Sequence, residues 1–302
     1  MPRSPLISVV VGAYNAHKYI DEMVRSILGQ TFADFEFIIV DDGSTDHTLD
    51  ILRGYERQDA RLKVIANPHG GIVDAANAGI QHAQCELIAR ADADDIALPD
   101  RFEKQLRYMQ THPEVCALGA QMLLIDPYGI PLLETKLPLD HEGIDKEMLG
   151  GSGWAMPQPV AMVRRGALME IGCYRKEYEW AEDLDLFLRL AEHGRLANLP
   201  DVLVKYRIHL ESTNHTKYQY QIMIKRKLVA EAYQRRGMSM PDNWTFTPRK
   251  VLPPDQQYRH WAWRALAAGQ LPAARRHALN ALRYGPLKRE SWVTTFHAFR
   301  GS

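Results

Sequence analysis

The first hundred residues alternate between short apolar runs and segments of helical periodicity, and this alternation restricts the possible folds more than any other feature. The runs 6–11, 35–40, 63–66 and 86–89 are largely continuous rather than alternating, as in strands buried on both faces. Helical patterns separate them at 19–28, 49–55 and 73–82. Short strand–helix–strand links give parallel strands with right-handed crossovers. We therefore predict an α/β fold with a mostly parallel central sheet flanked by helices.

Candidate ligand-binding residues lie at the ends of three of these predicted strands. Ala13 and Tyr14 end the first, Asp41 and Asp42 the second, and residues 92–95 the fourth. Ligands of such sheets bind at the carboxyl edge of the strands, so these residues are expected to converge on one cleft. Three carboxylates within four positions repel one another, and a hard cation such as Mg2+ or Mn2+ relieves that repulsion. A metal-bridged diphosphate site is predicted; the alternative for this stretch alone is a solvated acidic turn before a helix.

Two common nucleotide signatures are absent from the sequence. The first predicted strand leads into Gly12-Ala13-Tyr14-Asn15, without the G-x-G-x-x-G dinucleotide fingerprint. The chain also has no G-x-x-x-x-G-K-[ST] P-loop. Without a glycine-rich phosphate cradle, carboxylates that hold a metal become the favoured way to bind a diphosphate.

Later segments predict further strands and a second, helical domain. Strands are expected at 115–125, 158–164 and 202–208, with a hairpin turn at 126–129. We place a catalytic domain at residues 1–215 and a basic helical extension at 216–302. The extension is expected to contain a helix at 218–236, a linker at 238–254 and a helical hairpin at 258–268 and 272–283.

Charge and cysteine content bear on location and partners. Residues 216–302 hold 16 Lys or Arg against 4 Asp or Glu, whereas residues 1–215 hold 21 against 33. The basic, aromatic face of Trp261, Trp263, Arg275 and Arg276 suits an anionic membrane surface or a lipid-diphosphate acceptor, with a solvated cap or a homodimer contact as alternatives.

Three cysteines outside any C-x-x-C pair favour a reducing compartment. The run 6–11 is too short for a signal peptide, and no run reaches the ~18 residues of a membrane span. We expect a cytoplasmic protein, peripheral at the inner face of the cell membrane.

Three motifs in fixed order carry a family resemblance. Residues 8–15 (SVVVGAYN), 40–46 (VDDGSTD) and 89–95 (ARADADD) resemble the inverting family-two glycosyltransferases, which have the GT-A fold. The resemblance covers about residues 5–210. The chain departs from the family at Ala13, where Pro is usual, and at Ala76, where many relatives carry Arg.

The resemblance implies a role for each matching residue. Tyr14 and Asp41 would contact the nucleoside base, and Asp42 would lie beside the ribose or support its loop. Asp92 and Asp94 are the acids of the D-x-D motif, at the ribose and at the metal-bound diphosphate. We expect the nucleotide-sugar contacts to come from Ala13, Tyr14, Asn15, Asp41, Asp42, Asn77, Arg90, Asp92, Ala93 and Arg207. Taken alone, Asp41-Asp42-Gly43 is also explained by an Asx turn.

A second landmark is Glu182-Asp183, at the start of a predicted helix at 180–190. Alone, the pair would be ordinary acidity at a helix N-terminus. In the family an E-D pair here supplies the catalytic base, which implies Asp183 as the base and Glu182 as a supporting acid or acceptor contact. The segment Tyr206-Arg207-Ile208-His209 resembles the family's closing motif. It implies that Arg207 neutralises the departing diphosphate and that His209 joins Asp94 and Asp95 as metal ligands.

The resemblance thus implies a Mn2+- or Mg2+-dependent enzyme that transfers a sugar from a nucleotide-diphosphate sugar to an acceptor hydroxyl with inversion. UDP is the favoured nucleotide, with GDP and dTDP open. The acceptor would be a saccharide or lipid-linked saccharide in cell-surface polysaccharide or glycolipid assembly, and no nucleic-acid partner is expected. Two other classes remain: a sugar-phosphate nucleotidyltransferase, which needs a basic glycine-rich loop that this sequence lacks, and a non-catalytic nucleotide-sugar-binding protein.

Overall fold

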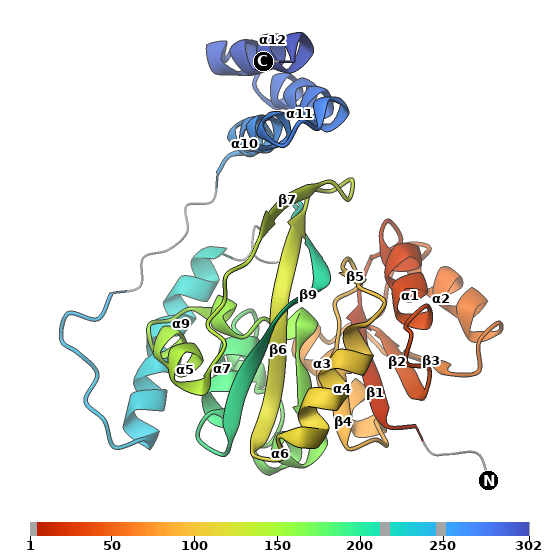
Figure 1. Cartoon of the computed structure of the whole chain (residues 1–302), viewed down its shortest axis with the longest axis vertical. Helices are drawn as coiled ribbons and strands as arrows, with labels where there is room; N and C mark the ends of the chain where they lie inside the picture. Colours follow the sequence, from red (N-terminus) through yellow and green to blue (C-terminus); the bar gives the residue numbers. More distant parts are fainter. Residues whose placement is uncertain (1–4, 212–217, 246–251, 302) are drawn as a thin grey trace. The chain divides into compact units, whose positions relative to one another are not determined.

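The computed structural model describes residues 5–211, 218–245 and 252–301 (Figure 1). The chain divides into two compact units. The first comprises Met1–Met122, Thr135–Tyr206 and Gln219–Phe246, and the second comprises Leu123–Glu134, Arg207–Tyr218 and Thr247–Ser302. This division differs from the expected boundary at residue 215, because the helix that follows it packs into the core of the first unit through Leu228, Val229 and Ala232.

A mixed sheet forms the centre of the fold. Its strand order is β3-β2-β1-β4-β8-β6-β9-β5, with β7 paired to β6. The pairings among β1 to β4 are parallel, whereas β8 pairs antiparallel with β4 and β6, β5 with β9, and β7 with β6. The sheet is therefore parallel only in its N-terminal half. The strands are β1 (Ile7–Ala13), β2 (Phe35–Asp41), β3 (Leu62–Ala66), β4 (Leu87–Arg90), β5 (Ile96–Ala97), β6 (Val115–Ile125), β7 (Pro131–Glu134), β8 (Met162–Arg164) and β9 (Arg195–Arg207).

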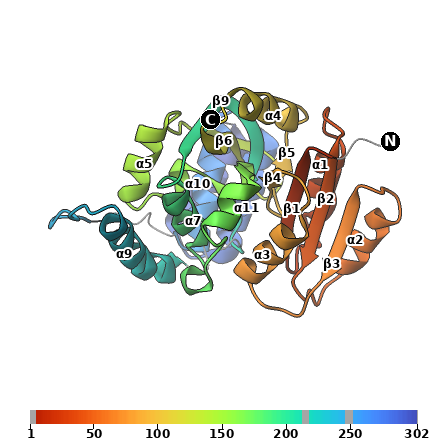
Figure 2. The ribbon, with the colours of Figure 1, turned by 90° about the horizontal axis from the view of Figure 1, so that it is seen from below.

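Helices cover both faces of the sheet in the first unit (Figure 2). One face packs on α1 (Ile20–Leu28), α2 (Thr48–Glu56) and α4 (Arg101–Thr111). The other face packs on α3 (Ile72–His82), α5 (His141–Leu149), α6 (Arg165–Glu170), α7 (Glu182–Leu190) and α9 (Tyr218–Arg235). Short 3-10 turns lie at η1 (Gly153–Ala155), η2 (Gln158–Val160) and η3 (Lys176–Tyr178).

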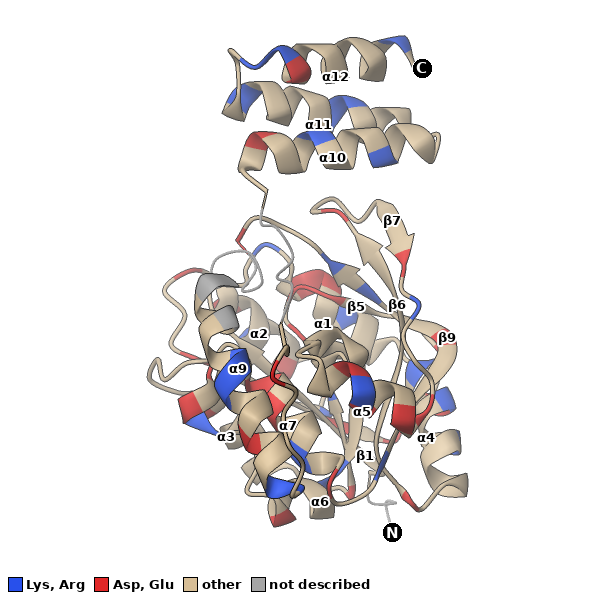
Figure 3. Cartoon of the chain, turned by 90° about the vertical axis from the view of Figure 1, so that its left-hand side faces the viewer, with Lys and Arg blue, Asp and Glu red and all other residues tan. Residues whose placement is uncertain are grey.

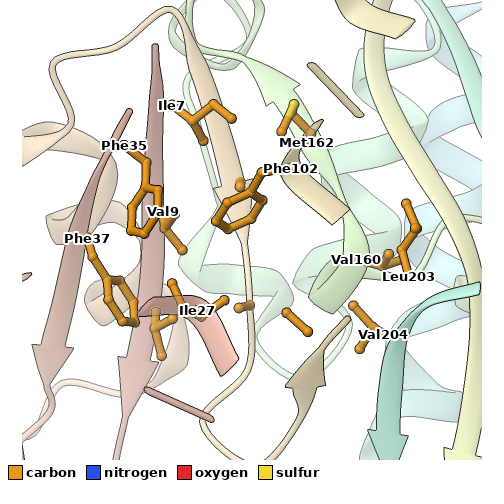
Figure 4. Packing of buried hydrophobic residues seen from close by; sticks show 14 of the residues in the cluster. Ile7, Val9, Ile27, Phe35, Phe37, Phe102, Val160, Met162, Leu203 and Val204 are labelled. Carbon is orange, nitrogen blue, oxygen red and sulfur yellow. The ribbon is translucent and has the colours of Figure 1, made fainter. Parts of the chain in front are cut away.

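The two hydrophobic clusters follow from the alternation of side chains along each strand. Successive side chains of a strand point to opposite faces. Ile7 and Val9 of β1 therefore join the cluster with α1 and Phe102 (Figure 4), whereas Val10 joins the cluster with α3 and α7. Burial on both faces explains why the sequence of β1 is a continuous apolar run rather than an alternating one.

The structure confirms the strand–helix alternation of the first hundred residues and the strand at 115–125 with its hairpin. The predicted strand at 158–164 is wrong in its first half, because Pro157 and Pro159 cannot donate to a strand ladder and residues 158–160 form a 3-10 turn. Helix α5 was missed, although the carboxylate of Asp140 caps it by accepting the Gly143 N–H at 2.8 Å.

The second unit contains the β6–β7 hairpin end and three helices, α10 (Pro254–Ala267), α11 (Leu271–Tyr284) and α12 (Arg289–Arg300). Helix α12 was not predicted. The hairpin turn is tied to α11 by Asp126, whose buried carboxylate lies 2.5 Å from Nε2 of the buried His277. The other carboxylate oxygen of Asp126 accepts the backbone N–H groups of Tyr128 and Ile130.

No helix in the described ranges is both long and apolar enough to cross a membrane.

The position of Phe102 generates a stability prediction. Its ring is fully buried and meets the ring of Phe35 edge-on, with 5.4 Å between centroids. Phe102→Ala should lower the free energy of unfolding by about 3–5 kcal/mol, because the cavity adds to the lost burial. Urea denaturation would measure the change, with Met169→Ala on exposed α6 as the control that stays close to the unmodified protein. A loss below ~1 kcal/mol would contradict this packing.

Candidate active site

The ends of β1, β2 and β4 meet at one edge of the sheet. These strands are parallel and in close register, with Ala13 beside Asp41 and Val10 beside Arg90. The backbone N–H of Asp42 donates to the carbonyl of Ala13 at 2.8 Å. The loops that follow the three strands therefore emerge side by side, as predicted from the strand order.

Asp41 offers a hydrogen-bond acceptor inside the protein. Its side chain is 1% exposed, and Oδ2 accepts the backbone N–H of Ser44 at 3.1 Å. Its Oδ1 has no hydrogen-bond partner among the described residues. Gly43 holds the turn with φ of 73°, and a Cβ there would lie 2.7 Å from the backbone nitrogen of His69. The tight turn thus presents an unused carboxylate oxygen, the acceptor expected for an N–H of a nucleobase.

Asp42 supports the neighbouring loop. Its two carboxylate oxygens accept the backbone N–H groups of Gly70 and Gly71 at 2.8 and 2.9 Å, and Oδ2 lies 2.8 Å from Nδ1 of His69. Of the two roles open from the sequence, loop support is the one with observed contacts. His69 in turn stacks on Tyr14, with 4.2 Å between ring centroids, and Tyr14 remains 47% exposed. The result is an exposed, flat aromatic surface beside the Asp41 turn.

Asn15 connects the first two loops. It adopts a left-handed backbone with φ of 48°, which Asn tolerates better than most residues. Its side-chain oxygen accepts the N–H of Thr45 at 2.8 Å, and its own N–H donates to the Ser44 hydroxyl at 3.0 Å. Asn15 therefore positions the loop that carries Asp41. Ala13 is 2% exposed and Ala93 packs partly against the core, so their side chains contribute shape rather than polar contacts.

Arg90 and Tyr174 form a buried pair beneath these loops. The guanidinium of Arg90 is 2% exposed, donates from Nη1 to the Val10 carbonyl at 2.8 Å and lies 5.8 Å from the ring centre of Tyr174. Asn77 fixes the Tyr174 backbone by two reciprocal hydrogen bonds of 2.9 and 3.1 Å. The amide of Asn77 is thus used within the protein, and its expected part in donor binding would act through Tyr174.

The phenol of Tyr174 was not expected to belong to the site. Its hydroxyl is buried and has no hydrogen-bond partner among the described residues. Burial raises the pKa of the phenol; the charge of Arg90 opposes this, while the carboxylates of Glu182, Asp183 and Asp92 add to it. A buried polar atom without a partner is costly and calls for an explanation. A ligand group would supply the missing partner.

Acidic residues from β4 and α7 share one environment. The pKa of Asp92 is raised to about 6, first by burial and then by the charges of Asp94 and Asp183, while Arg90 and Arg101 oppose the shift. Asp183 therefore lies close enough to Asp92 for the two carboxylates to repel, although 91 positions separate them in the chain. The structure brings together the D-x-D acids and the E-D pair.

Arg101 is the cation beneath this acidic cluster. Its side chain is fully buried and donates to the Arg90 carbonyl at 2.6 Å and to Gln105 at 3.0 Å. Burial lowers the pKa of the Arg101 guanidinium, and the charges of Asp95 and Asp92 oppose this. Asp95, itself 3% exposed, was expected to contact metal or donor sugar; the structure gives it a second role as a counter-charge to Arg101.

Glu182 and Asp183 begin α7. The pKa of Glu182 is raised to about 8, first by burial and then by the charge of Asp183, while the backbone N–H groups of Glu182 and Trp180 oppose the shift. Burial also raises the pKa of Asp183, against the charge of Lys225 in α9. Oδ1 of Asp183 accepts the Leu184 N–H at 2.7 Å, and a Cβ at Gly153 would lie 3.6 Å from Oδ2. A partly exposed carboxylate with a raised pKa is suited to accept a proton.

Arg207 and His209 belong to the second unit. Arg207 is buried and donates from Nη1 to the carbonyls of Asp126 and Pro127 at 3.5 and 3.4 Å. Nδ1 of His209 lies 3.9 Å from the carboxylate of Glu211. Both residues therefore have observed contacts around the base of the hairpin, and their roles toward donor and metal stay predictions.

A preformed metal cage is absent from the part of the chain that the structure describes: no three His, Cys, Asp or Glu side chains are grouped to hold an ion. Mg2+ is commonly held by only one or two carboxylates, with water and substrate phosphates as its other ligands. The repulsion between Asp92 and Asp94 and the oxygen-only character of the cluster suit such an open site for a hard cation.

Three residues of the site escaped sequence reasoning: Arg101, Tyr174 and Lys225. The sequence predicts no role for Arg101, and its burial under the acidic stretch depends on the packing of α4. Tyr174 lies eight positions before Glu182, next to Arg175, Lys176 and Glu177, and belongs to no motif that would mark it. Lys225 lies on a helix assigned to the other domain. Nothing local in the sequence distinguishes these side chains.

Comparisons with known proteins agree with this geometry. Residues 8–172 match the family model described as "Glycosyl transferase family 2". An uncharacterized glycosyltransferase of Haemophilus influenzae is 33% identical over 80% of this chain and 78% of its own length. The O-antigen biosynthesis glycosyltransferase WbnJ of Escherichia coli is 32% identical over 71% of this chain and 84% of its own length.

Two solved structures share the fold. One is Staphylococcus aureus TarS, residues 1–349, in complex with UDP-GlcNAc, with a TM-score of 0.59 and 21% identity over 98% of this chain and 89% of that chain. The other is the mannosyltransferase PcManGT of Pyrobaculum calidifontis in complex with GDP-Man and Mn2+, with a TM-score of 0.56 and 18% identity over 99% and 86%. The GT-A fold expected from the motifs is confirmed.

The raised pKa of Glu182 generates a prediction about pH and stability. Its pKa is about 8 in the folded protein against an ordinary value of 4.5, so the folded state binds more protons than the unfolded state between these values. The free energy of unfolding should therefore fall as pH rises through this window. Glu182→Gln removes the ionisation and should stabilise the protein at pH 8 by about 1 kcal/mol or more, with little change at pH 4.5.

Urea denaturation at both pH values, without divalent cations, measures this effect. Glu134→Gln, at an exposed position of β7, is the matched control and should keep the pH dependence of the unmodified protein. An unchanged pH dependence in Glu182→Gln would show that Glu182 ionises normally.

Proposed function

We propose that this chain moves a sugar from a nucleotide-diphosphate sugar to an acceptor hydroxyl with inversion at the anomeric carbon. The premise is that the chain belongs to glycosyl transferase family 2 and is a glycosyltransferase. The observation that carries the proposal is that Asp92 and Asp183 share one partly buried site, where the charge of Asp183 raises the pKa of Asp92. A carboxylate at the donor diphosphate and a carboxylate that takes a proton are the two groups that such a transfer requires.

The nucleoside would bind at the loops after β1 and β2. The unused Oδ1 of Asp41 would accept an N–H of the base, and the exposed ring of Tyr14 would lie against its face. Uracil and guanine both carry a ring N–H, so this acceptor fits UDP and GDP. We favour UDP, which TarS binds as UDP-GlcNAc, while the related PcManGT holds GDP-Man.

A divalent cation, Mn2+ or Mg2+, would be held by Asp94, with Asp95 and His209 as further candidates, and would stabilise the charge that develops on the leaving diphosphate. The open set of carboxylates supports this proposal, as does the Mn2+ bound by PcManGT. Asp92 would accept a ribose hydroxyl. Arg90, buried under Asp92, and Arg207 add positive charge for the diphosphate.

Asp183 would act as the general base. The proton of the acceptor hydroxyl passes to its carboxylate while the acceptor oxygen bonds to the anomeric carbon. The bond from that carbon to the diphosphate oxygen breaks on the opposite face, and the nucleoside diphosphate leaves. Burial raises the pKa of Asp183 and so makes its carboxylate a stronger base. Glu182 and the hydroxyl of Tyr174 would hydrogen-bond the acceptor or the donor sugar.

The acceptor would be a saccharide or lipid-linked saccharide of cell-surface polysaccharide assembly. WbnJ, a relative of similar length, acts in O-antigen biosynthesis by its name. With a cytoplasmic nucleotide sugar as donor, the enzyme would work at the inner face of the cell membrane. The basic helices of the second unit would then face an anionic lipid surface.

The role of Asp183 can be tested by Asp183→Asn. The variant should bind donor as the unmodified protein does, while the rate of transfer falls by about 10²–10⁴-fold, because only the proton acceptor is lost. Release of nucleoside diphosphate measures transfer and calorimetry measures donor binding. Asp50→Asn, at an exposed position of α2, is the control and should keep full activity. Full activity in Asp183→Asn would assign the base elsewhere.

The donor and the metal can be tested together by thermal shift. UDP-sugars and GDP-sugars should raise the melting temperature more with Mn2+ than with a chelator, because ligands that bind only the folded state stabilise it. Asp94→Asn should abolish the Mn2+-dependent part of the shift. Asp41→Asn should weaken the shift both with Mn2+ and with the chelator. No shift with any nucleotide sugar would count against the proposed donor class.

A further inference from the structure

Helix α12 in the second unit packs with its small residues and exposes its large ones. The residues that it buries are Ser291, Thr294 and Ala298, with exposures of 0%, 1% and 0%. Trp292 and Phe296 are both 60% exposed, and Phe299 is 51% exposed. A helix of a water-exposed domain normally shows the opposite distribution. Burial of this face therefore requires something outside the described part of the unit.

The exposed apolar residues form one continuous face. At 3.6 residues per turn, Trp292, Phe296 and Phe299 fall within about 60° of one another, and Val293 widens the face to about 120°. The buried residues lie on the opposite side of the helix. Leu287, which is 97% exposed, precedes α12, and the indole N–H of Trp292 donates to the carbonyl of Pro286 at 2.8 Å. That bond holds the loop of Leu287 against the start of the same helix.

Basic residues surround this face. Arg289 and Arg300, at the two ends of α12, fall within the 120° face, between the aromatic side chains and Val293. Arg283, in the last turn of α11, and Lys288, directly before α12, are both exposed. Figure 3 shows that Lys and Arg predominate over Asp and Glu on α10, α11 and α12. Residues 252–301 contain eight basic and two acidic side chains.

The two acidic side chains do not offset this charge on the exposed face. Asp255 is 9% exposed and accepts from Arg259 at 2.8 Å. Glu290 is exposed but lies about 150° around the helix from the centre of the aromatic arc. A second copy of this face would bring like charges together, which opposes self-association. An anionic, apolar partner complements both features.

We propose that the α12 face, defined as Leu287, Trp292, Val293, Phe296 and Phe299 with Arg289 and Arg300, lies in the interface of an anionic lipid bilayer. Aromatic rings are favoured at the level of the lipid headgroups, and Arg side chains near them pair with anionic headgroups. The face differs from the one expected from the sequence, because Trp261 is 1% exposed and Arg276 lies over the ring of Tyr128 at 4.2 Å.

This inference deepens the proposed function, since a lipid-linked acceptor would place the enzyme at such a surface. The contact itself is independent of the chemistry. The second unit can hold the membrane through α12 whether or not the first unit transfers a sugar.

Vesicle flotation of the full chain tests the proposal. The unmodified protein should float with vesicles of phosphatidylcholine and phosphatidylglycerol, bind vesicles of phosphatidylcholine alone far less, and be released by salt. Trp292→Ser combined with Phe296→Ser should lower the partition coefficient by at least about tenfold, because two rings no longer enter the interface. Arg289→Glu combined with Arg300→Glu should remove the preference for anionic lipid. Met169→Ser, at a similarly exposed position of the first unit, should bind as the unmodified protein does.

Three results would overturn the proposal: no flotation of the unmodified protein with anionic vesicles, unchanged flotation of the Trp292 and Phe296 variant, or a concentration-dependent dimer that this variant abolishes. Transfer to a soluble acceptor without vesicles separates the two proposals. The variant should retain the turnover of the unmodified protein in that assay. If the unmodified protein shows no transfer but still binds anionic vesicles, the proposed function fails and the membrane surface stands.

Discussion

Repulsion among carboxylates that are kept from water is the constraint on which this site depends. The chain places Asp92, Asp94 and Asp95 after one strand and Glu182 and Asp183 at the start of a helix, and the fold brings the two groups together. Such an arrangement costs stability unless positive charge lies nearby. Buried Arg90 and Arg101 supply part of that charge from below. In the proposed function a bound cation would supply the rest of the positive charge, and hydrogen-bond donors of the substrate would pair with the carboxylate oxygens. The energetic cost of the apo site and its affinity for ligand would then have the same physical source.

The rest of the first unit holds these groups in place through backbone contacts. Asp42 fixes the loop of residues 69–71, Asn15 fixes the loop of Asp41, and Asn77 fixes Tyr174. In each case a polar side chain satisfies backbone groups of a distant segment rather than facing the ligand. Residues that family resemblance assigns to ligand binding thus also have a structural task. Substituting them would change both the position of the loops and the contacts with the donor. The stability and the donor affinity of such variants should therefore be measured together.

The second unit depends on a different balance of burial. Asp126 and His277 form a buried polar contact that joins the hairpin turn to α11, and small side chains let the three helices pack closely. The large apolar residues that remain are directed outward on α12. A unit of this size that leaves such rings in water gives up stability that it could otherwise gain. The exposed position of these rings is explained if a binding partner of the unit contacts them.

Much of the fold and of the site follows from the sequence alone. Continuous apolar runs, helical periodicity and acidic residues after β2 and β4 determine the strand–helix alternation and the shared edge, because these signals are local. The motifs also identify the family. Tertiary structure alone decided that Arg101 and Tyr174 lie under the acidic cluster, that α9 belongs to the first unit, and that α12 packs through Ser291, Thr294 and Ala298. The physical reason is that burial is a property of the packed chain. The sequence gives the charge and size of each side chain, whereas the packing of distant segments determines its neighbours and its exposure to water.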